Sequence, residues 1–397
     1  MYKSFRVKNF RCFKDLQIND LGRVNLIAGQ NNTGKTALLE AMYIFTRPKS
    51  PGVLLDLQEI RGLVEPEASR RDYWRQYFSD MDSAEPIVFE TNEKGSEAYI
   101  ALILSELSDL EVSNGLFEGY RRFLEEELRL TVSESHKQLE QIDAILEFSM
   151  SEKGHKFSPA YLPSNSDLPT RSFRQVESNS EFIPVQGREQ RITTLKRLSQ
   201  LDKHGDTTLL IHVLAGLDPR LSDVRLSMPD GVMDIWARVN GALLPLKAMG
   251  EGVNRICHIL VTMLSGVDYL FVDEIENGIH HSVQSKVWKA IGQVARELDI
   301  QVFATTHSYE MIEAAHEAFK DDDPYEFRFH RLNRRSDDDY KDEIEAITYN
   351  KAGVEAFIRS HYEVRGWGAI RSTRASTVSC SSRDSMIGPS LISWRNI

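Results

Sequence analysis

The sequence has few of the features that mark membrane or disulfide-bonded proteins. Its 397 residues include three cysteines, Cys12, Cys257 and Cys380, which show neither metal-ligand spacing nor a disulfide framework. The apolar stretch at 256–272 is interrupted by polar residues and a glycine, so no membrane span is expected. The amino terminus lacks the apolar core of a signal peptide. We therefore expect a cytoplasmic protein, in a reducing compartment, that does not enter a membrane.

The chain also lacks an excess of positive charge. Its formal net charge of -11 argues against a surface that is uniformly basic for nucleic acid, although a local basic patch stays open. The charged share of 27% and the hydrophobic share of 41% are ordinary for a soluble globular protein. A chain of this length buries a large core and is expected to hold one large domain with an insertion, or two domains.

What the sequence does contain is a glycine-rich phosphate-binding pattern. Residues 29–36 read G-x-x-x-x-G-K-T, between an apolar run at 24–28 and a helix-forming run that starts at Ala37. Strand, glycine loop and helix are the context that this motif requires. Gly29 and Gly34 let the backbone turn tightly, so successive N–H groups point at phosphate oxygens, and the helix adds its free N–H groups and its dipole.

The loop residues have separate expected roles in binding ATP and Mg²⁺. Lys35 is expected to reach the β- and γ-phosphates, and the Thr36 hydroxyl to ligate Mg²⁺. The alternative is a glycine turn beside a chance Lys-Thr pair, which the flanking patterns disfavour. The other predicted nucleotide contacts in this motif are Gly29, Asn31, Asn32, Thr33, Gly34 and Ala37.

A second motif is an apolar run at 269–272 that ends in two carboxylates. In a parallel sheet its carboxyl end would lie beside the phosphate loop. Asp273 is then expected to hold Mg²⁺ through water, and Glu274 is the candidate base that polarises the attacking water. An acidic strand end that faces solvent is the alternative.

A third motif, at 301–308, is another buried strand, with His307 at its tip. We expect His307 to hydrogen-bond the γ-phosphate and to report its loss. Ser308 is also a good N-cap for the helix that follows, and the two roles are compatible. The predicted catalytic set is therefore Glu274, His307 and Lys35.

A fourth motif, at 248–252, places two glycines directly before a helix. Gly250, Glu251 and Gly252 form a second cluster of backbone N–H groups suited to a phosphate. One nucleotide does not need two such clusters from one subunit, whereas two facing subunits do. Taken alone, Gly-x-Gly is a weak signal, and the start of a helix is its simpler explanation.

The order of predicted elements indicates an α/β fold with a mostly parallel sheet, antiparallel N-terminal strands and a largely helical insertion. Strands are predicted at 2–8, 12–18, 24–28, 86–91, 98–104, 222–227, 232–238, 242–246, 268–273, 300–305, 325–331 and 342–348. Helices are predicted at 37–45, 54–60, 66–80, 117–148, 187–203, 206–216, 253–264, 279–297, 308–319 and 351–361, with a long surface loop at 149–185.

These elements divide the chain into four segments. Residues 1–52 and 206–365 form the two parts of one head, and 53–205 form a mainly helical lid or arm. Residues 366–397 contain eight serines and no lysine or glutamate, and they show no periodicity. We interpret this last segment as a disordered or non-native tail, such as a frameshift product, with a partner-binding tail as the alternative.

The four motifs, with a long insertion after the first, resemble the ABC-type P-loop ATPase heads of SMC, RecF and OLD proteins. Residues 5–13 are similar to the I-x-N-F-R-x-F opening of those heads. The resemblance implies an ABC-ATPase-like head in which Arg11 lies near the nucleotide, 250–252 form the signature loop and 276–280 the D-loop. Met249 departs from the serine of that signature, and Gln58 is only a candidate for the Q-loop residue.

The stretches at 246–252, 273–280 and 304–310 also look like one prokaryotic branch of stand-alone ATPases. These are often paired with a TOPRIM-type nuclease in anti-phage defence, and the ATPase subunits (AriA) of PARIS systems are the suggested match. The resemblance covers roughly 1–365, poorly at 53–205. It implies a homo-oligomer with head-to-head ATPase interfaces that restrains an effector nuclease and releases it when a phage trigger protein is sensed.

Two other functions stay open. A DNA-repair ATPase of the RecF or SMC kind would bind DNA, with arginine pairs at 70–71, 121–122 and 334–335 contributing to a basic stripe. A self-contained OLD-type nuclease is least favoured, because a TOPRIM domain needs about a hundred further residues and little chain follows His307. The acidic runs at 321–323 and 337–339 are more simply solvated loops.

Overall fold

The computed structural model describes most of the chain. The described residues are 1–47, 52–62, 74–93, 96–106, 114–142, 144–164, 170–172, 179–185, 190–204, 207–228, 231–335 and 343–360. The tail predicted at 366–397, the arginine pair at 70–71 and the acidic run at 337–339 lie outside the described residues.

A six-stranded sheet carries the phosphate loop. Its order is β16-β15-β3-β14-β13-β9, and only β16 runs antiparallel to its neighbour. All residues of β3 and β14 are buried, which explains their largely apolar sequences. The carboxyl ends of the parallel strands meet at one edge, where the motifs emerge. The strands are β3 (Val24–Gly29), β9 (Ser180–Ile183), β13 (Tyr269–Val272), β14 (Gln301–Thr306), β15 (Phe327–Arg334) and β16 (Ile344–Tyr349).

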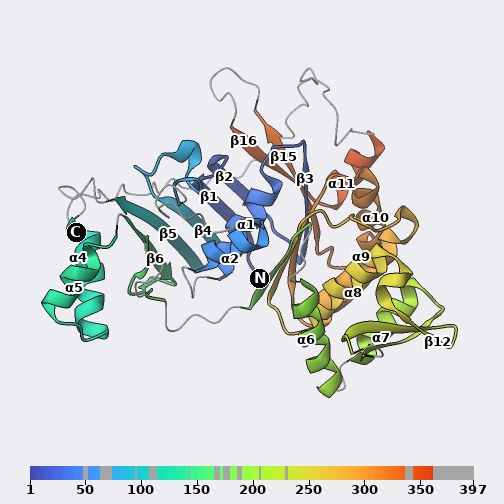
Figure 1. The fold of residues 1–397 in the computed structure, drawn as a ribbon. Helices are drawn as coiled ribbons and strands as arrows, with labels where there is room; N and C mark the ends of the chain where they lie inside the picture. Colours follow the sequence, from blue (N-terminus) through green and yellow to red (C-terminus); the bar gives the residue numbers. More distant parts are fainter. Residues whose placement is uncertain are drawn as a thin grey trace. The chain divides into compact units, whose positions relative to one another are not determined.

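Helices cover both faces of this sheet (Figure 1). One core joins Leu26 and Val302 of the sheet to helices such as α8 and α9 through Ile256 and Trp288. No helix in the described part of the chain is long and apolar enough to cross a bilayer. The helices on the face that carries α8 and α9 are α6 (Gln190–His204), α7 (Thr207–Leu217), α8 (Glu251–Leu264), α9 (His281–Glu297), α10 (Tyr309–Phe319) and α11 (Lys351–Arg359).

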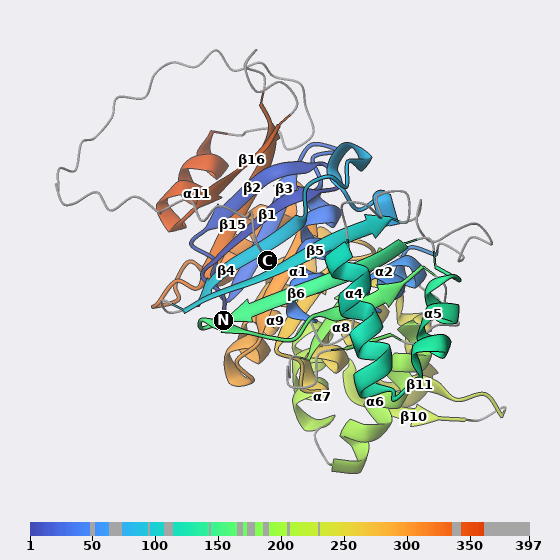
Figure 2. The ribbon, with the colours of Figure 1, turned by 90° about the vertical axis from the view of Figure 1, so that its left-hand side faces the viewer.

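On the opposite face, α1 (Lys35–Thr46) lies between the six-stranded sheet and an antiparallel sheet, whose strands Figure 2 shows side by side. Leu38 and Met42 share a core with Val7 of one sheet and Phe303 of the other. The order of the second sheet is β2-β1-β4-β5-β6-β7, with β8 also paired to β6. Its strands are β1 (Ser4–Phe10), β2 (Phe13–Asn19), β4 (Ile87–Glu93), β5 (Ser96–Glu106), β6 (Ala144–Glu152), β7 (His155–Lys156) and β8 (Ala160–Pro163).

Shorter elements complete the fold. An antiparallel sheet of β10, β11 and β12 leads through a single helical turn into α8. The elements are α2 (Val53–Ile60), η1 (Ser79–Met81), α4 (Asn114–Arg122), the π-helix η3 (Phe123–Glu127), α5 (Val132–Leu139), β10 (Leu221–Ser227), β11 (Asp234–Val239), β12 (Ala242–Pro245) and η4 (Leu246–Met249).

The predicted α/β fold with antiparallel N-terminal strands is confirmed, but two predictions within the insertion are wrong. The helix predicted to 148 ends earlier, because Leu146, Phe148 and Met150 alternate with polar residues and face the core from β6. The loop predicted at 149–185 contains β7, β8 and β9. Of the helix predicted at 66–80, only 74–80 are described, and they include part of η1.

The insertion at 53–205 is therefore only in part the helical lid or arm that the sequence predicts. Strand β4 pairs with β1, which joins the insertion to the amino terminus in one sheet. Strand β9 pairs with β13 in the sheet of the phosphate loop. The backbone groups at a strand edge need hydrogen-bond partners, and here β4 and β9 provide them for β1 and β13. The insertion is therefore part of both sheets of the head.

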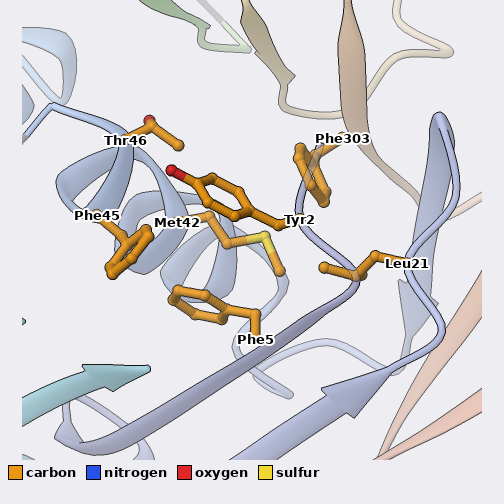
Figure 3. Close-up of a pocket in the computed structure, with 7 residues that line it drawn as sticks. All are labelled: Tyr2, Phe5, Leu21, Met42, Phe45, Thr46 and Phe303. Atoms are coloured by element: carbon orange, nitrogen blue, oxygen red, sulfur yellow. The ribbon is translucent and has the colours of Figure 1, made fainter. Parts of the chain in front are cut away.

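A small apolar pocket lies at the amino terminus (Figure 3). Its volume of about 10 Å³ is close to the lower limit for one water molecule, so it offers no room for a ligand. Tyr2 stacks on Tyr269 with ring centroids 4.9 Å apart, which fixes the amino terminus against the core. The lining residues are Tyr2, Phe5, Leu21, Met42, Phe45, Thr46 and Phe303.

The buried His330 and the half-buried His258 predict that the fold loses stability in acid. Burial and nearby arginines lower the pKa of His258 to about 4 and that of His330 to about 3. The unfolded chain binds protons on both below about pH 6.5, so the free energy of unfolding falls as pH drops through that value. Between its folded pKa and about pH 6.5, each histidine lowers the free energy of unfolding by about 1.4 kcal/mol for each unit that the pH drops.

Urea unfolding between pH 5 and 7.5 tests this expectation. His330→Gln should flatten the pH dependence by roughly one proton, because it removes one of the two groups. An unchanged slope in the His330 variant would contradict the assignment.

Candidate functional site

The phosphate loop links β3 to α1 as predicted. Gly34 is the N-cap of α1, with φ of 83°, in the left-handed region that favours glycine. A Cβ at this position would lie 2.5 Å from Sγ of Cys12 and 2.6 Å from the ring of Phe13. The turn between β1 and β2 therefore closes on the loop so tightly that only glycine fits.

The predicted backbone contacts surround this turn. Asn31 and Asn32 are exposed at its rim, and Asn32 has φ of 61°. The buried Thr33 donates its hydroxyl hydrogen to the Gln30 carbonyl at 2.8 Å, and Ala37 lies in the first turn of α1. The first N–H groups of a helix have no acceptor within it, so they are available to an anion.

Strand β15 supports the loop from the side, which the sequence motif does not reveal. A Cβ on Gly29 would lie 2.5 Å from the Leu332 carbonyl oxygen, so glycine is needed for this close approach. The Arg334 guanidinium donates to the Asn32 carbonyl at 3.2 Å. The arginine pair at 334–335 was a candidate for a DNA stripe, but Arg334 contacts the phosphate loop.

Lys35 points into the loop. Its Nζ donates to the carbonyls of Gly29 at 3.0 Å and Gln30 at 2.8 Å, and the residue is 6% exposed. Burial lowers the pKa of Lys35 to about 8, against the charges of Asp273 and Glu274, which raise it. The amine is thus held where phosphate oxygens would replace the carbonyls as acceptors.

Asp273 lies directly across from the loop. The Thr36 hydroxyl is 2.9 Å from Oδ2 of Asp273 and 3.2 Å from Oδ1. A second hydroxyl, from Thr305 at the carboxyl end of β14, donates to Oδ1 at 2.6 Å. The structure therefore brings together the two residues that the sequence predicts for Mg²⁺.

Glu274 and His307 face each other beside this carboxylate. Nε2 of His307 is 3.6 Å from Oε1 of Glu274, and the Asn277 amide donates to Oε2 at 3.1 Å. The backbone N–H of His307 donates to Oε1 of Glu276 at 2.6 Å. Ser308 caps α10 through the Met311 N–H at 3.1 Å, so the structure contains the predicted cap.

Glycine is favoured at positions 250 and 252 for different structural reasons. Gly250 has φ of 105° at the N-cap of α8, which favours glycine, and nothing crowds its Cβ position. A Cβ on Gly252 would lie 2.2 Å from the Gly278 carbonyl oxygen, so the predicted signature loop packs directly on the predicted D-loop. The Glu251 carboxylate would repel a phosphate, so the nucleotide contact predicted for Glu251 would have to be made by its backbone N–H group.

The sequence matches a known family across this site. The profile of the family described as "AAA domain, putative AbiEii toxin, Type IV TA system" matches residues 24–313, from β3 into α10. The chain belongs to this family.

Individual relatives of this AAA-domain chain match it over different lengths. An "ATP/GTP phosphatase" of Helicobacter pylori is 25% identical over 350 residues, which cover 81% of this chain and 90% of that protein. A "DNA replication and repair protein RecF" of Exiguobacterium is 27% identical over 139 residues, 32% of this chain and 37% of that protein. A solved SMC head bound to the C-terminal winged-helix domain of ScpA is 12% identical, with a TM-score of 0.44, over 88% of this chain and 97% of that chain.

The nucleotide contact predicted for Arg11 stays a prediction. In this AAA-domain chain Nε of Arg11 is 2.9 Å from Oε2 of the buried Glu40 on α1, and its guanidinium lies 4.8 Å from the centroid of the Tyr77 ring. Arg61 pairs with the other oxygen of Glu40 at 2.5 Å. Arg11 thus ties the β1–β2 turn to α1 through a buried carboxylate.

Sequence reasoning missed Arg255, on the first turns of α8. Its guanidinium donates to the carbonyls of Asp273 at 2.6 Å and Glu274 at 3.1 Å, so it links α8 to the end of β13. The sequence offered one signal for it: Arg255 is a cation five residues after Gly250 and lies on the same helix face as Glu251.

Three further sequence candidates lie among the described residues. Gln58, the Q-loop candidate, is buried on α2. Within the acidic run at 321–323, Asp322 pairs with Arg296 at 2.7 Å. Arg121 pairs with Glu118 at 2.7 Å. Among the described residues, no three His, Cys, Asp or Glu side chains are grouped so that they could hold a metal ion.

Proposed function

We propose that this chain is an ATP-hydrolysing switch that assembles with copies of itself and controls a partner effector nuclease of the TOPRIM type in anti-phage defence. The meeting of Lys35, Thr36, Asp273 and Glu274 at one sheet edge is the observation that supports hydrolysis. The similarity to a named ATP/GTP phosphatase is consistent with it. Among such switches, we propose that the chain belongs with the ATPase subunits of PARIS systems.

The donor set at Thr36 and Asp273 fits Mg²⁺. A hydroxyl and a carboxylate oxygen 2.9 Å apart are hard oxygen ligands close enough to hold one cation. Bound there, Mg²⁺ would neutralise charge on the β- and γ-phosphates. The chain's own contribution is to fix these two oxygens, which lie on different elements.

The other side chains divide the reaction among them. Lys35 exchanges its two carbonyl acceptors for phosphate oxygens, so its ammonium group stays in the loop and remains hydrogen-bonded. Glu274 accepts a proton from the attacking water, and Asn277 holds one of its oxygens. His307, beside Glu274, donates to the γ-phosphate and is released when that phosphate leaves.

Assembly would complete the site. The N–H groups at 250–252 open the first turn of α8, where a phosphate is favoured by the helix dipole. We propose that they close on the triphosphate held by a second copy. Full ATPase activity in a permanently monomeric chain would contradict this.

ATP binding should take up a proton at alkaline pH. The free Lys35 amine has a pKa of about 8, and bound phosphates raise it. Affinity should therefore fall as pH rises through 8, by up to about tenfold per pH unit. Calorimetry at pH 8.5 in buffers of different ionisation enthalpy should show that protons are taken up when ATP binds. This proton uptake should be smaller at pH 7, where the amine is already charged. Affinity that does not change from pH 7 to 9 would contradict this.

Co-purification of this chain with the product of its genomic neighbour, sized with and without ATP, tests the proposed switch. We expect a stable complex with a nuclease, and a change in its size or composition on adding ATP. Recovery of the chain without any nuclease would remove the effector from the proposal.

A DNA-repair ATPase of the RecF or SMC kind is the second candidate, and the RecF similarity favours it. Such a protein should bind DNA with an affinity that falls steeply as salt rises, because bound cations are released from the phosphates. The absence of DNA binding at moderate salt would remove this candidate.

A further inference from the structure

A single buried hydroxyl joins the two carboxylate residues of the site. Thr305 lies at the carboxyl end of β14 and is 1% exposed. Its Oγ1 is 2.6 Å from Oδ1 of Asp273 and 2.8 Å from the backbone nitrogen of Glu274. Strands β13 and β14 are neighbours, so this side chain spans the point where both strands end.

The chemistry of the two contacts fixes their direction. An amide N–H can only donate, so the Thr305 oxygen accepts from Glu274. The one hydroxyl hydrogen is then directed at the Asp273 carboxylate, which accepts it. Because Oδ1 is held in this way, Oδ2 is the oxygen nearer to Thr36, at 2.9 Å. One hydroxyl therefore decides which carboxylate oxygen is presented to the phosphate loop.

The Glu274 backbone needs such an anchor. Glu274 has φ of 46°, a left-handed conformation that is strained for a residue other than glycine. Four contacts hold it. Thr305 Oγ1 accepts its N–H, and the next N–H, of Ile275, donates to the Thr305 carbonyl at 3.0 Å. Its carbonyl accepts from Arg255 at 3.1 Å and from the Asn277 N–H at 3.1 Å. Thr305 supplies two of the four, and they are the two on the N–H side of Glu274.

We propose that Thr305 is a positioning residue that sets the metal-facing oxygen of Asp273 and the direction of Glu274 together. Its hydroxyl contacts the chain's own Asp273 and Glu274. The inference rests on the proposed ATPase function and deepens it, because it couples the metal ligand to the base. A chain without this hydroxyl should still bind nucleotide at the phosphate loop, since Lys35 and its carbonyl partners are unchanged.

The test compares Thr305→Val, which removes the hydroxyl, with Thr305→Ser, which keeps it. The first measurement is Mn²⁺ affinity in the presence of ADP, by electron paramagnetic resonance. The second is ATP turnover at saturating Mg²⁺, and the third is the affinity for a fluorescent ATP analogue in EDTA. Thr305→Val should weaken Mn²⁺ binding about 10-fold and turnover about 10- to 100-fold, the usual range for a group that orients a metal ligand.

The same variant should leave nucleotide affinity in EDTA unchanged, and Thr305→Ser should recover metal affinity and turnover to within about threefold of wild type. Thr91→Val is the matched control. Thr91 is a buried strand threonine outside the site, whose hydroxyl donates to the Ser4 carbonyl at 2.6 Å, so its loss should affect thermal stability alone.

Wild-type Mn²⁺ affinity and turnover in Thr305→Val would overturn the inference. So would an equal loss of metal-free nucleotide affinity that Thr305→Ser does not restore, because that pattern indicates general damage. If Thr305→Val does not fold, Thr305→Ala removes the same hydroxyl without adding a methyl group and takes its place. Failure of the ATPase proposal is distinguishable, since wild type and Lys35→Ala would then turn over ATP alike.

Discussion

Glu274→Gln is expected to stop ATP hydrolysis while ATP stays bound. Glutamine keeps the shape of the side chain but cannot accept a proton from water, so turnover should fall about 100- to 10,000-fold. The contacts of Lys35 and Thr36 are unaffected, and retained ATP should hold two copies together for longer. Steady-state phosphate release, retained nucleotide and the size of the assembly with ATP are the measurements.

Glu297→Gln provides the control for this variant. Glu297 is an exposed glutamate at the last position of α9, so the same chemical change there should leave turnover at the wild-type rate. Hydrolysis by the Glu274 variant at the wild-type rate would show that another group activates the water.

Lys35→Ala is expected to abolish nucleotide binding. The change removes an amine whose two contacts become charge-assisted bonds to phosphate, each worth about 1.5–3 kcal/mol. Two such bonds correspond to a loss of affinity of about 100-fold or more. Equilibrium binding of a fluorescent ATP analogue measures this loss, and turnover should disappear with it.

Thermal melting separates this loss from unfolding. Lys289→Ala, at an exposed position of α9, should bind ATP like the wild type. The Lys35 variant should melt close to the wild-type temperature without nucleotide and should gain no stability when ATP is added. ATP affinity within threefold of wild type would place the phosphates elsewhere.

The motifs were predictable because each combines a strong local pattern with a fixed place in an α/β sheet. An apolar run followed by glycines and Lys35, or by Asp273 and Glu274, predicts both a buried strand and the residue at which that strand ends. Parallel strands bring those ends to one edge, so the meeting of Thr36 with Asp273 follows from topology.

The insertion was less predictable because its strands carry little local signal. Strand β9 has only four residues, and its partner β13 lies about ninety residues further along the chain. Strand β6 has a clear alternation of buried and exposed residues, but it continues a charged helical stretch that hid the change of period.

By itself, the sequence determined which chemical groups are present and at which ends of which strands they emerge, since these depend on local periodicity and residue type. Only the tertiary structure decided how those groups are held. Thr305, Arg255 and Arg334 act through contacts between elements far apart in the chain, and such contacts leave no pattern in a local window. The structure also showed that Gly252 is required by the approach of Gly278, a reason that depends on backbone packing in three dimensions.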